Sequence, residues 1–195
     1  MKRILFVLAA LTSLCACSQD DPVKDAISAK VAEIVGGEPK VSIYTVEKID
    51  SVTFGQQLDM TDKLFAVIRK QNEKFYFKYM SQNLFNEALD KRASLVKNDY
   101  VIEGLKAIRE RMADSLDVVA YYDYKFSGKA KKADGVTEIP EAYASIKPDG
   151  TLISLEPDKD RLHNGLGKVI PGYSELLDAD KNELDAEIQS KARRK

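Results

Sequence analysis

The sequence lacks most of the residues on which enzymes build metal sites and activated nucleophiles. Its 195 residues include two cysteines, one histidine and no tryptophan. Both cysteines, Cys15 and Cys17, lie near the amino terminus, so the rest of the chain offers no disulfide, thiol nucleophile or cysteine zinc site. A single histidine, His163, makes a serine–histidine triad or a histidine zinc site hard to build. We therefore expect no metal and no cofactor, and lean away from an enzyme.

Phosphate-binding loops and an excess of one charge are also missing. Gly128-Lys129 is followed by alanine, and Gly165-Leu166-Gly167-Lys168 is too short for a dinucleotide fingerprint. The 30 basic and 31 acidic residues give a net charge of −1. A nearly neutral chain argues against nucleic acid as a partner.

The amino terminus has the pattern of an export signal. Two basic residues precede an apolar run over 4–11, which is too short to span a bilayer permanently. Leu14-Cys15-Ala16-Cys17 follows and resembles the lipobox of bacterial lipoproteins. The resemblance implies that the chain is cut before Cys17 and that this residue carries acyl groups such as palmitate, which would anchor the protein to a membrane. In the alternative, an ordinary secretory signal, Cys17 would be a free thiol in an oxidising compartment.

An acidic run follows the lipobox, formed by Ser18, Gln19, Asp20 and Asp21. It resembles the signal that sends lipoproteins of the Bacteroidota to the cell surface. The same residues would serve equally well as a solvated tether, which would leave the protein on the periplasmic face. The sequence thus predicts an outer membrane lipoprotein and leaves its face open.

Composition divides the chain into a signal peptide (1–16), a lipidated tether with a short helix (17–40), one domain (41–177) and a charged tail outside the core (178–195). The short helix is predicted from apolar residues at helical spacing behind an Asp20 or Asp21 cap and Pro22. Whether it packs on the domain or stands in the tether is open.

Hydrophobic periodicity predicts two long helices within the domain. Residues 40–58 alternate as a strand, with an irregularity near Glu47-Lys48. Residues 59–116 contain no proline and carry two amphipathic stripes, with a break at Ser81-Gln82-Asn83 or near Asp90-Lys91. The first stripe is Leu64, Ile68, Phe75 and Tyr79, widened by Phe65 and Tyr76. The second, interrupted by Asn98 and Arg109, is Leu95, Ile102, Leu105, Met112 and Leu116.

Three further strands are expected after the helices. The first covers 118–126, where alternation places Tyr122 and Phe126 on the buried face and Tyr121 and Asp123 on the other. The others, 141–146 and 151–155, form a hairpin around a Pro-Asp-Gly turn. The predicted fold is α+β: an antiparallel sheet of about four strands packed on a hairpin of two long helices, preceded by a signal peptide and a short helix.

A local resemblance lies near the carboxyl end. The segment 166–177, Leu-Gly-Lys-Val-Ile-Pro-Gly-Tyr-Ser-Glu-Leu-Leu, resembles the part of FKBP-type peptidyl-prolyl isomerases that floors the proline pocket. Over residues 118–177 the resemblance implies Val169, Ile170 and Tyr173 as pocket residues. The family's Phe-Asp-Ser-Ser is replaced by Val-Thr-Glu-Ile at 136–139, and the family's last strands are not found, which implies a degenerate enzyme.

Other candidates have simpler explanations. His163 could be a general base, although a lone surface histidine is the commoner case. Asp114, Asp117 and Asp123 could form a carboxylate cluster, although the first two would more simply end a helix. The lysines between 125 and 132 suggest a protected strand edge or an anion-binding patch.

Three functions follow from these patterns. The first is a non-enzymatic, membrane-anchored lipoprotein that binds a protein or envelope partner through its sheet face or its helical hairpin. The second is an FKBP-like folding helper, either a degenerate or an active peptidyl-prolyl isomerase. The third is a small-ligand-binding domain with a cavity between helices and sheet, lined by Phe75, Tyr79, Tyr122 and Phe126.

Overall fold

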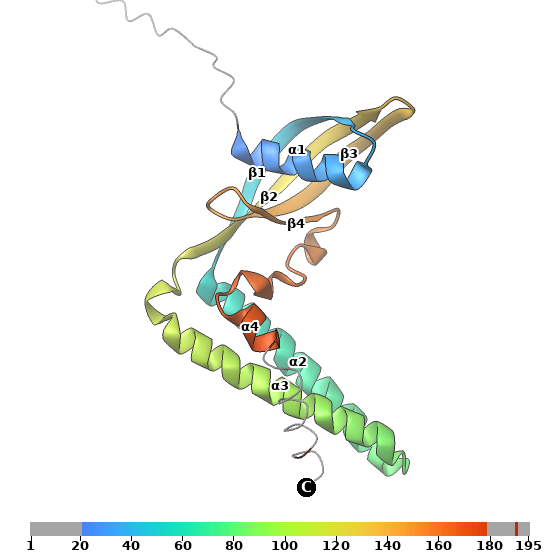
Figure 1. Cartoon of the computed structure of the whole chain (residues 1–195), viewed down its shortest axis with the longest axis vertical. Helices are drawn as coiled ribbons and strands as arrows, with labels where there is room; N and C mark the ends of the chain where they lie inside the picture. Colours follow the sequence, from blue (N-terminus) through green and yellow to red (C-terminus); the bar gives the residue numbers. More distant parts are fainter. Residues whose placement is uncertain (1–20, 179–189, 191–195) are drawn as a thin grey trace, which may run out of the picture.

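The computed structural model describes residues 21–178 and residue 190 (Figure 1). The helices are α1 (Pro22–Val35), α2 (Phe54–Ser81), α3 (Phe85–Arg111) and α4 (Tyr173–Asp178), with 3-10 turns at Ala113–Ser115, Lys159–Arg161 and Leu166–Val169. The strands are β1 (Lys40–Thr53), β2 (Val119–Lys132), β3 (Gly135–Ile146) and β4 (Leu152–Glu156). The predicted α+β class, with a four-stranded antiparallel sheet and two long helices, is confirmed.

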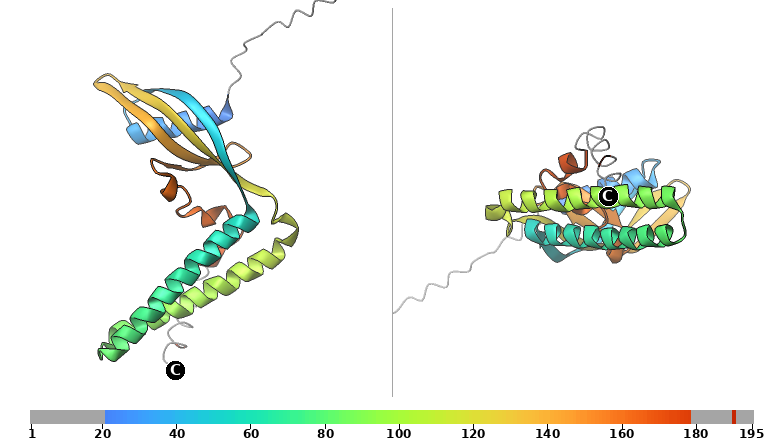
Figure 2. Two further views of the ribbon diagram at one scale, coloured as in Figure 1. Left: turned by 180° about the vertical axis from the view of Figure 1, so that it is seen from behind. Right: turned by 90° about the horizontal axis from the view of Figure 1, so that it is seen from below.

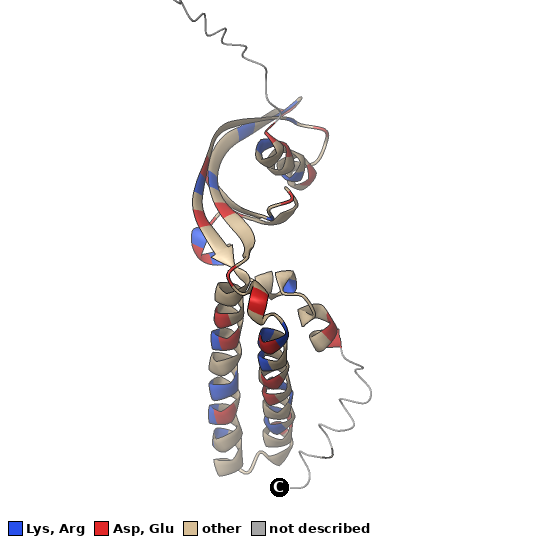
Figure 3. Cartoon of the chain, turned by 90° about the vertical axis from the view of Figure 1, so that its left-hand side faces the viewer, with Lys and Arg blue, Asp and Glu red and all other residues tan. Residues whose placement is uncertain are grey.

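The sheet is a meander in the order β1-β2-β3-β4, and it curves around α1 (Figure 3). Helix α1 begins at Pro22 because the Asp21 carboxylate caps it, accepting hydrogen bonds from the backbone N–H groups of Val23 (3.1 Å) and Lys24 (3.4 Å). It buries Ile27 and Val31 against the sheet. The sequence left open whether this short helix packs on the domain or stands in the tether; the structure shows that it packs on the domain.

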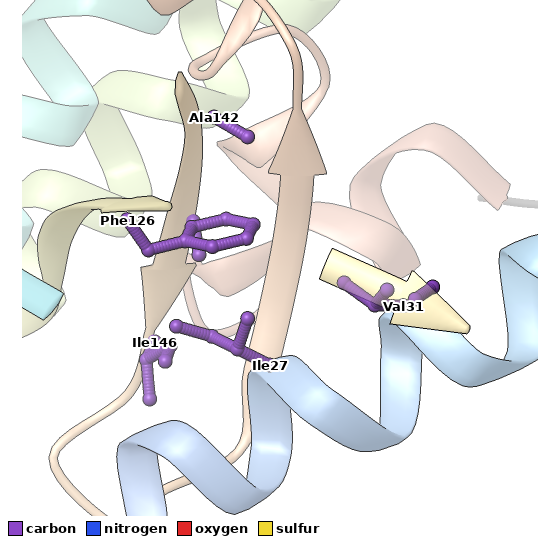
Figure 4. Close-up of a cluster of buried hydrophobic side chains, with 7 residues drawn as sticks. Ile27, Val31, Phe126, Ala142 and Ile146 are labelled. Carbon is purple, nitrogen blue, oxygen red and sulfur yellow. The ribbon is translucent and has the colours of Figure 1, made fainter. Parts of the chain in front are cut away.

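The first core cluster lies between α1 and the sheet (Figure 4). Its buried members are Ile27, Val31, Phe126, Ala130, Ala142, Ala144 and Ile146. Alanines dominate the β2 and β3 contribution because a helix lying in the hollow of a curved sheet leaves little room for larger side chains. Burial of this apolar surface stabilises the sheet half of the molecule.

The strands run further than the alternation suggested. β2 continues past Phe126 to Lys132, and β3 begins at Gly135. The pairing shifts between Phe126 opposite Ala142 and Gly128 opposite Ile139, so β3 carries an extra residue there. Pro140 lies within this bulge, where a residue without an N–H is tolerated.

A helical hairpin leaves one end of the sheet and projects away from it (Figures 1 and 2). The prediction that residues 54–58 continue the strand is wrong, since α2 begins at Phe54. Thr53 and Gln56 form a capping box, in which each side chain accepts from the other's backbone N–H. The 28 residues of α2 give an arm about 42 Å long. The predicted break at 81–83 is confirmed, with Asn83 at φ 60°.

The foot of the hairpin packs on the carboxyl-terminal segment. A second core cluster joins α2 and α3 to this segment, and its buried members are Leu58, Val101, Leu105, Ile108, Met112, Ile170 and Tyr173. A third, smaller cluster of Val52, Ala120, Tyr121 and Leu166 joins the sheet to the same segment. Among the described residues, no helix combines the length and apolarity that crossing a bilayer requires.

Two predicted faces need correction. Tyr121 and Asp123, expected on the open face of β2, are buried because residues 157–170 cover them. Leu64, expected in the helical core, is 54% exposed. The residues of α2 that face α3 are instead spaced by alternating steps of three and four positions. Asn72 is one of them.

Candidate functional site

The two arms of the hairpin are held in register by polar contacts. The Asn72 side-chain amide donates to Asn98 Oδ1 at 3.1 Å, and Asn98 is buried. A partly buried asparagine pair of this kind fixes the register of helices, because any slip would leave both amides unpaired. The interruption that Asn98 makes in the apolar stripe is therefore a specific contact.

Two arginines connect the arms as well. Arg69 Nε lies 2.5 Å from Asp99 Oδ1, and Arg109 Nη2 lies 2.6 Å from Asp59 Oδ1 and 3.3 Å from Asp62 Oδ2. Both arginines therefore form contacts between the arms. Each partly exposed pair contributes little free energy, but together the pairs fix which faces meet.

Within the described part of the chain, no third layer covers the outer part of the hairpin. Over residues 62–97, all of which the structure describes, Ala88 alone is buried. Large apolar side chains are instead exposed along this part, and they are Leu64, Val67, Phe77, Met80, Leu84, Phe85 and Leu89. We call Phe77, Met80, Leu84, Phe85 and Leu89, which flank the turn, the tip patch. A concentration of exposed apolar side chains marks an interaction surface.

A second candidate site is a buried polar cluster where sheet, hairpin and carboxyl-terminal segment meet. We call Gln57, Thr61, Tyr121, Asp123, Ser145 and His163 the junction network. The Tyr121 hydroxyl donates to Gln57 Oε1 at 2.6 Å, and Gln57 Nε2 donates to Thr61 Oγ1 at 3.3 Å. The first bond ties β2 to α2, and the second lies within α2 and holds the Gln57 side chain in place.

The carboxylate of Asp123 is the centre of the junction network. It is 2% exposed; its Oδ1 accepts from Ser145 Oγ at 2.6 Å, and its Oδ2 lies 2.6 Å from His163 Nε2. The hydrogen bond to Asp123 raises the pKa of His163 above its ordinary value, despite an opposing effect of burial. Burial raises the pKa of Tyr121, and the charges of Asp123 and Asp50 act in the same direction. His163 therefore binds the carboxylate most strongly as an imidazolium.

This arrangement does not activate a nucleophile. In a catalytic triad the imidazole stands between the serine and the carboxylate, and it takes the proton of the serine hydroxyl. Here the carboxylate stands between Ser145 and His163, so the Ser145 hydroxyl donates to Asp123 and has no general base. The contacts instead fasten the segment that carries His163 to the sheet.

The structure separates the residues of the expected carboxylate cluster. Asp114 and Asp117 are exposed beside the end of α3, whereas Asp123 is buried in β2. Within the described residues, no three acidic, histidine or cysteine side chains are grouped as metal ligands.

The FKBP-like residues lie at the foot of the hairpin. Ile170 and Tyr173 are buried in the second core cluster, and Val169 packs against the third. A Cβ on Gly167 would lie 2.7 Å from the Tyr173 ring, so the ring packs directly on the backbone of this segment. Such packing favours a structural role for Tyr173 over a place in an open proline pocket.

The residues expected to line a ligand cavity do not meet. Phe126 is part of the core beneath α1, while Phe75 and Tyr79 stack on each other in the outer part of α2, with ring centroids 6.0 Å apart. The hairpin projects away from the sheet, which separates these groups (Figure 2). The prediction of a cavity lined by these residues is wrong.

Of the predicted membrane-targeting residues, Asp21 alone lies in the described part, and it caps α1. Cys17, Ser18, Gln19 and Asp20 lie outside the described residues. The exposed apolar surface of the hairpin was missed because single-helix periodicity assigned Leu64 to the core. The alternating step through Phe65, Ile68, Asn72 and Phe75 could have revealed the true contact face.

No protein-family model matches the chain, and neither a curated protein nor a solved structure shows significant similarity to it. Its function must therefore be inferred from its own residues and their geometry.

Proposed function

We propose that the protein is a lipoprotein of the outer membrane, anchored through Cys17, that uses its projecting hairpin to bind a protein partner. The observation that carries the proposal is the exposed tip patch at the end of a two-helix arm. Among the described residues no third layer covers these two helices, so their large apolar side chains stay exposed to solvent unless a partner covers them.

The geometry fits an anchored arm. Residue 21 lies in the sheet half of the molecule, and the turn of the hairpin lies at the opposite end (Figure 1). Cys17 precedes Asp21 by four positions, and four fully extended residues reach at most about 14 Å. A lipid on Cys17 would hold the sheet half near the membrane, and the tip patch would then point away from that membrane. The tip patch is therefore assigned to a protein partner.

The proposal is tested by site-specific photo-cross-linking in cells that express the full chain. A cross-linking residue at Leu84 reports on the tip patch, and one at Val136 is the control, because Val136 is also apolar and is more exposed than Leu84 but lies in the sheet half. We expect a protein adduct at Leu84 and none at Val136. Cys17→Ser should release the protein from the membrane fraction. Adducts of equal yield at both positions, or membrane retention of Cys17→Ser, would contradict the proposal.

A further inference from the structure

The outer side of α2 combines apolar and basic side chains. Lys63, Lys70, Lys74 and Lys78 are all exposed, and between Lys63 and Ser81 the sequence contains one acidic residue, Glu73, which lies 3.9 Å from Arg69. Within the described part of the chain, none of these four lysines forms a salt bridge. This local excess of positive charge stands on a chain whose net charge is −1.

A shallow, open groove lies between side chains on the same side of α2. It is lined by residues of α2 alone: Val67, Lys70, Gln71, Glu73, Lys74 and Phe77. Val67 and Phe77 are 64% and 62% exposed and stand ten positions apart, which is about 15 Å along the helix. Two apolar side chains at this spacing match the apolar stripe of a second helix over three turns.

We propose that this groove binds an acidic amphipathic helix of a protein partner; the inference rests on the proposed function of the hairpin as a binding arm. The apolar side chains of the partner helix seat between Val67 and Phe77, and its carboxylates meet Lys70 and Lys74. A helix is the fitting occupant because α2 satisfies its own backbone hydrogen bonds and offers no edge to an extended strand.

Charge argues against a second copy of the chain as the occupant, and the direction of the arm argues against a lipid surface. Two copies anchored in one membrane carry parallel hairpins, so pairing groove to groove would bring Lys70 and Lys74 close to their own copies, which is unfavourable. An anionic lipid surface would suit the lysines, but the groove lies along the side of an arm that extends from the anchored end. An acidic helix satisfies both the charge and the direction.

The test uses the full chain held in nanodiscs of zwitterionic lipid and two designed helical peptides. Both peptides carry leucine at the positions of one face; the first has glutamate at its other positions and the second has lysine. We expect the glutamate peptide to bind, more weakly as salt is added, and the lysine peptide to bind at least about tenfold more weakly, because opposite charges across an interface raise affinity and like charges reduce it.

Three double variants assign the site. Lys70→Glu with Lys74→Glu should reduce the affinity for the glutamate peptide by about tenfold, and Val67→Ser with Phe77→Ser by a similar factor. Lys97→Glu with Lys106→Glu makes the same charge change on exposed positions of α3 and should alter the affinity by less than about twofold. Equal affinity for both peptides, or equal losses from the α2 and α3 charge reversals, would overturn the proposal.

A cross-linking residue at Gln71, within the groove, separates this inference from the proposed function. We expect its adduct in cells to map to an acidic helical segment of another protein. An adduct with a second copy of the chain or with lipid, or binding of anionic phosphatidylglycerol vesicles in place of the glutamate peptide, would overturn the inference. If Leu84 captures a protein while the Gln71 result is negative, the inference fails and the proposed function stands; if neither position captures a protein, both fail.

Discussion

Asp21 serves the fold, whatever it does in targeting. Its carboxylate caps α1, and α1 supplies Ile27 and Val31 to the core of the sheet half. Asp21→Ala should therefore lower the free energy of unfolding by about 1 kcal/mol, as the loss of an N-cap does. Chemical denaturation of the purified protein would measure this loss, and an unchanged stability would contradict the capping role.

The cap also determines how the acidic run should be tested as a surface signal. Asp20→Ala with Asp21→Ser removes both charges but leaves a side chain that can cap α1. If this variant loses surface exposure on intact cells while its stability is kept, the run acts in export. If exposure is unchanged, the acidic residues act in capping and as a tether alone.

His163 makes the stability of the junction network depend on pH. The hydrogen bond to Asp123 raises its pKa, Asp50 of β1 acts in the same direction, and Lys159 opposes it. A group with a raised pKa in the folded state stabilises the fold fully below its unfolded pKa of about 6.5, and this contribution is lost as pH rises through the folded value. His163→Gln should therefore lower the melting temperature more at about pH 5.5 than at about pH 8.5.

Ser145→Ala is the matched control, because Ser145 binds the same carboxylate but does not titrate. It should cost about 1–2 kcal/mol with little dependence on pH over the same range. The melting temperature of each variant is measured by thermal unfolding across this pH range. Equal dependence of the two melting temperatures on pH would rule out a titrating contact at His163.

At the scale of the elements, the Asn72–Asn98 pair fixes the register of α2 against α3. Asn98→Ala leaves the Asn72 amide without its partner and should lower the free energy of unfolding by about 1–2 kcal/mol. Replacing both residues with leucine should recover at least part of this loss, because no amide is then left unpaired. A double-mutant cycle measured by denaturation would show the coupling, and strictly additive effects would contradict it.

The pairing of β1 with β2 depends on a glycine. A Cβ at Gly128 would lie 2.6 Å from the backbone oxygen of Ser42, whereas a Cβ at Gly135 would meet nothing within 4 Å. Gly128→Ala should therefore destabilise the protein by about 2 kcal/mol through a forced shift of the strands, while Gly135→Ala should be close to neutral. Thermal unfolding of the two variants would compare the sites, and similar melting temperatures would contradict this account.

The fold class and most elements could be predicted because helix caps, turn residues and alternation are local. Pro22, Asn83 and the Pro148-Asp149-Gly150 turn each stand where the structure uses them. Contacts between distant segments could not be predicted in this way. Nothing near Asp123 in the sequence shows that His163, forty positions later, covers it. The side of α2 that faces α3 likewise depends on a partner helix that periodicity within α2 does not identify.

At the scale of the whole molecule, the sheet half and the foot of the hairpin hold nearly all of the described core. Residues 73–97 can be replaced with a short glycine-rich turn between Asn72 and Asn98. This removes the tip patch, and the single buried residue that is lost from this fully described range is Ala88. The shortened protein should keep its sheet and unfold cooperatively, since the three core clusters remain. Circular dichroism and thermal scans would test this, and loss of cooperative unfolding would show that the outer arm supports the rest.

The direction of the hairpin also gives the molecule a mechanical property. A rigid arm about 42 Å long, joined to the sheet at its foot, is a lever. A sideways displacement of anything bound at the tip becomes a torque on the foot, where the Tyr121–Gln57 bond and the packing of Leu166 beside Tyr121 resist it. The junction network therefore resists this torque, and its strength decides how far a pull on the tip can turn the hairpin relative to the sheet half.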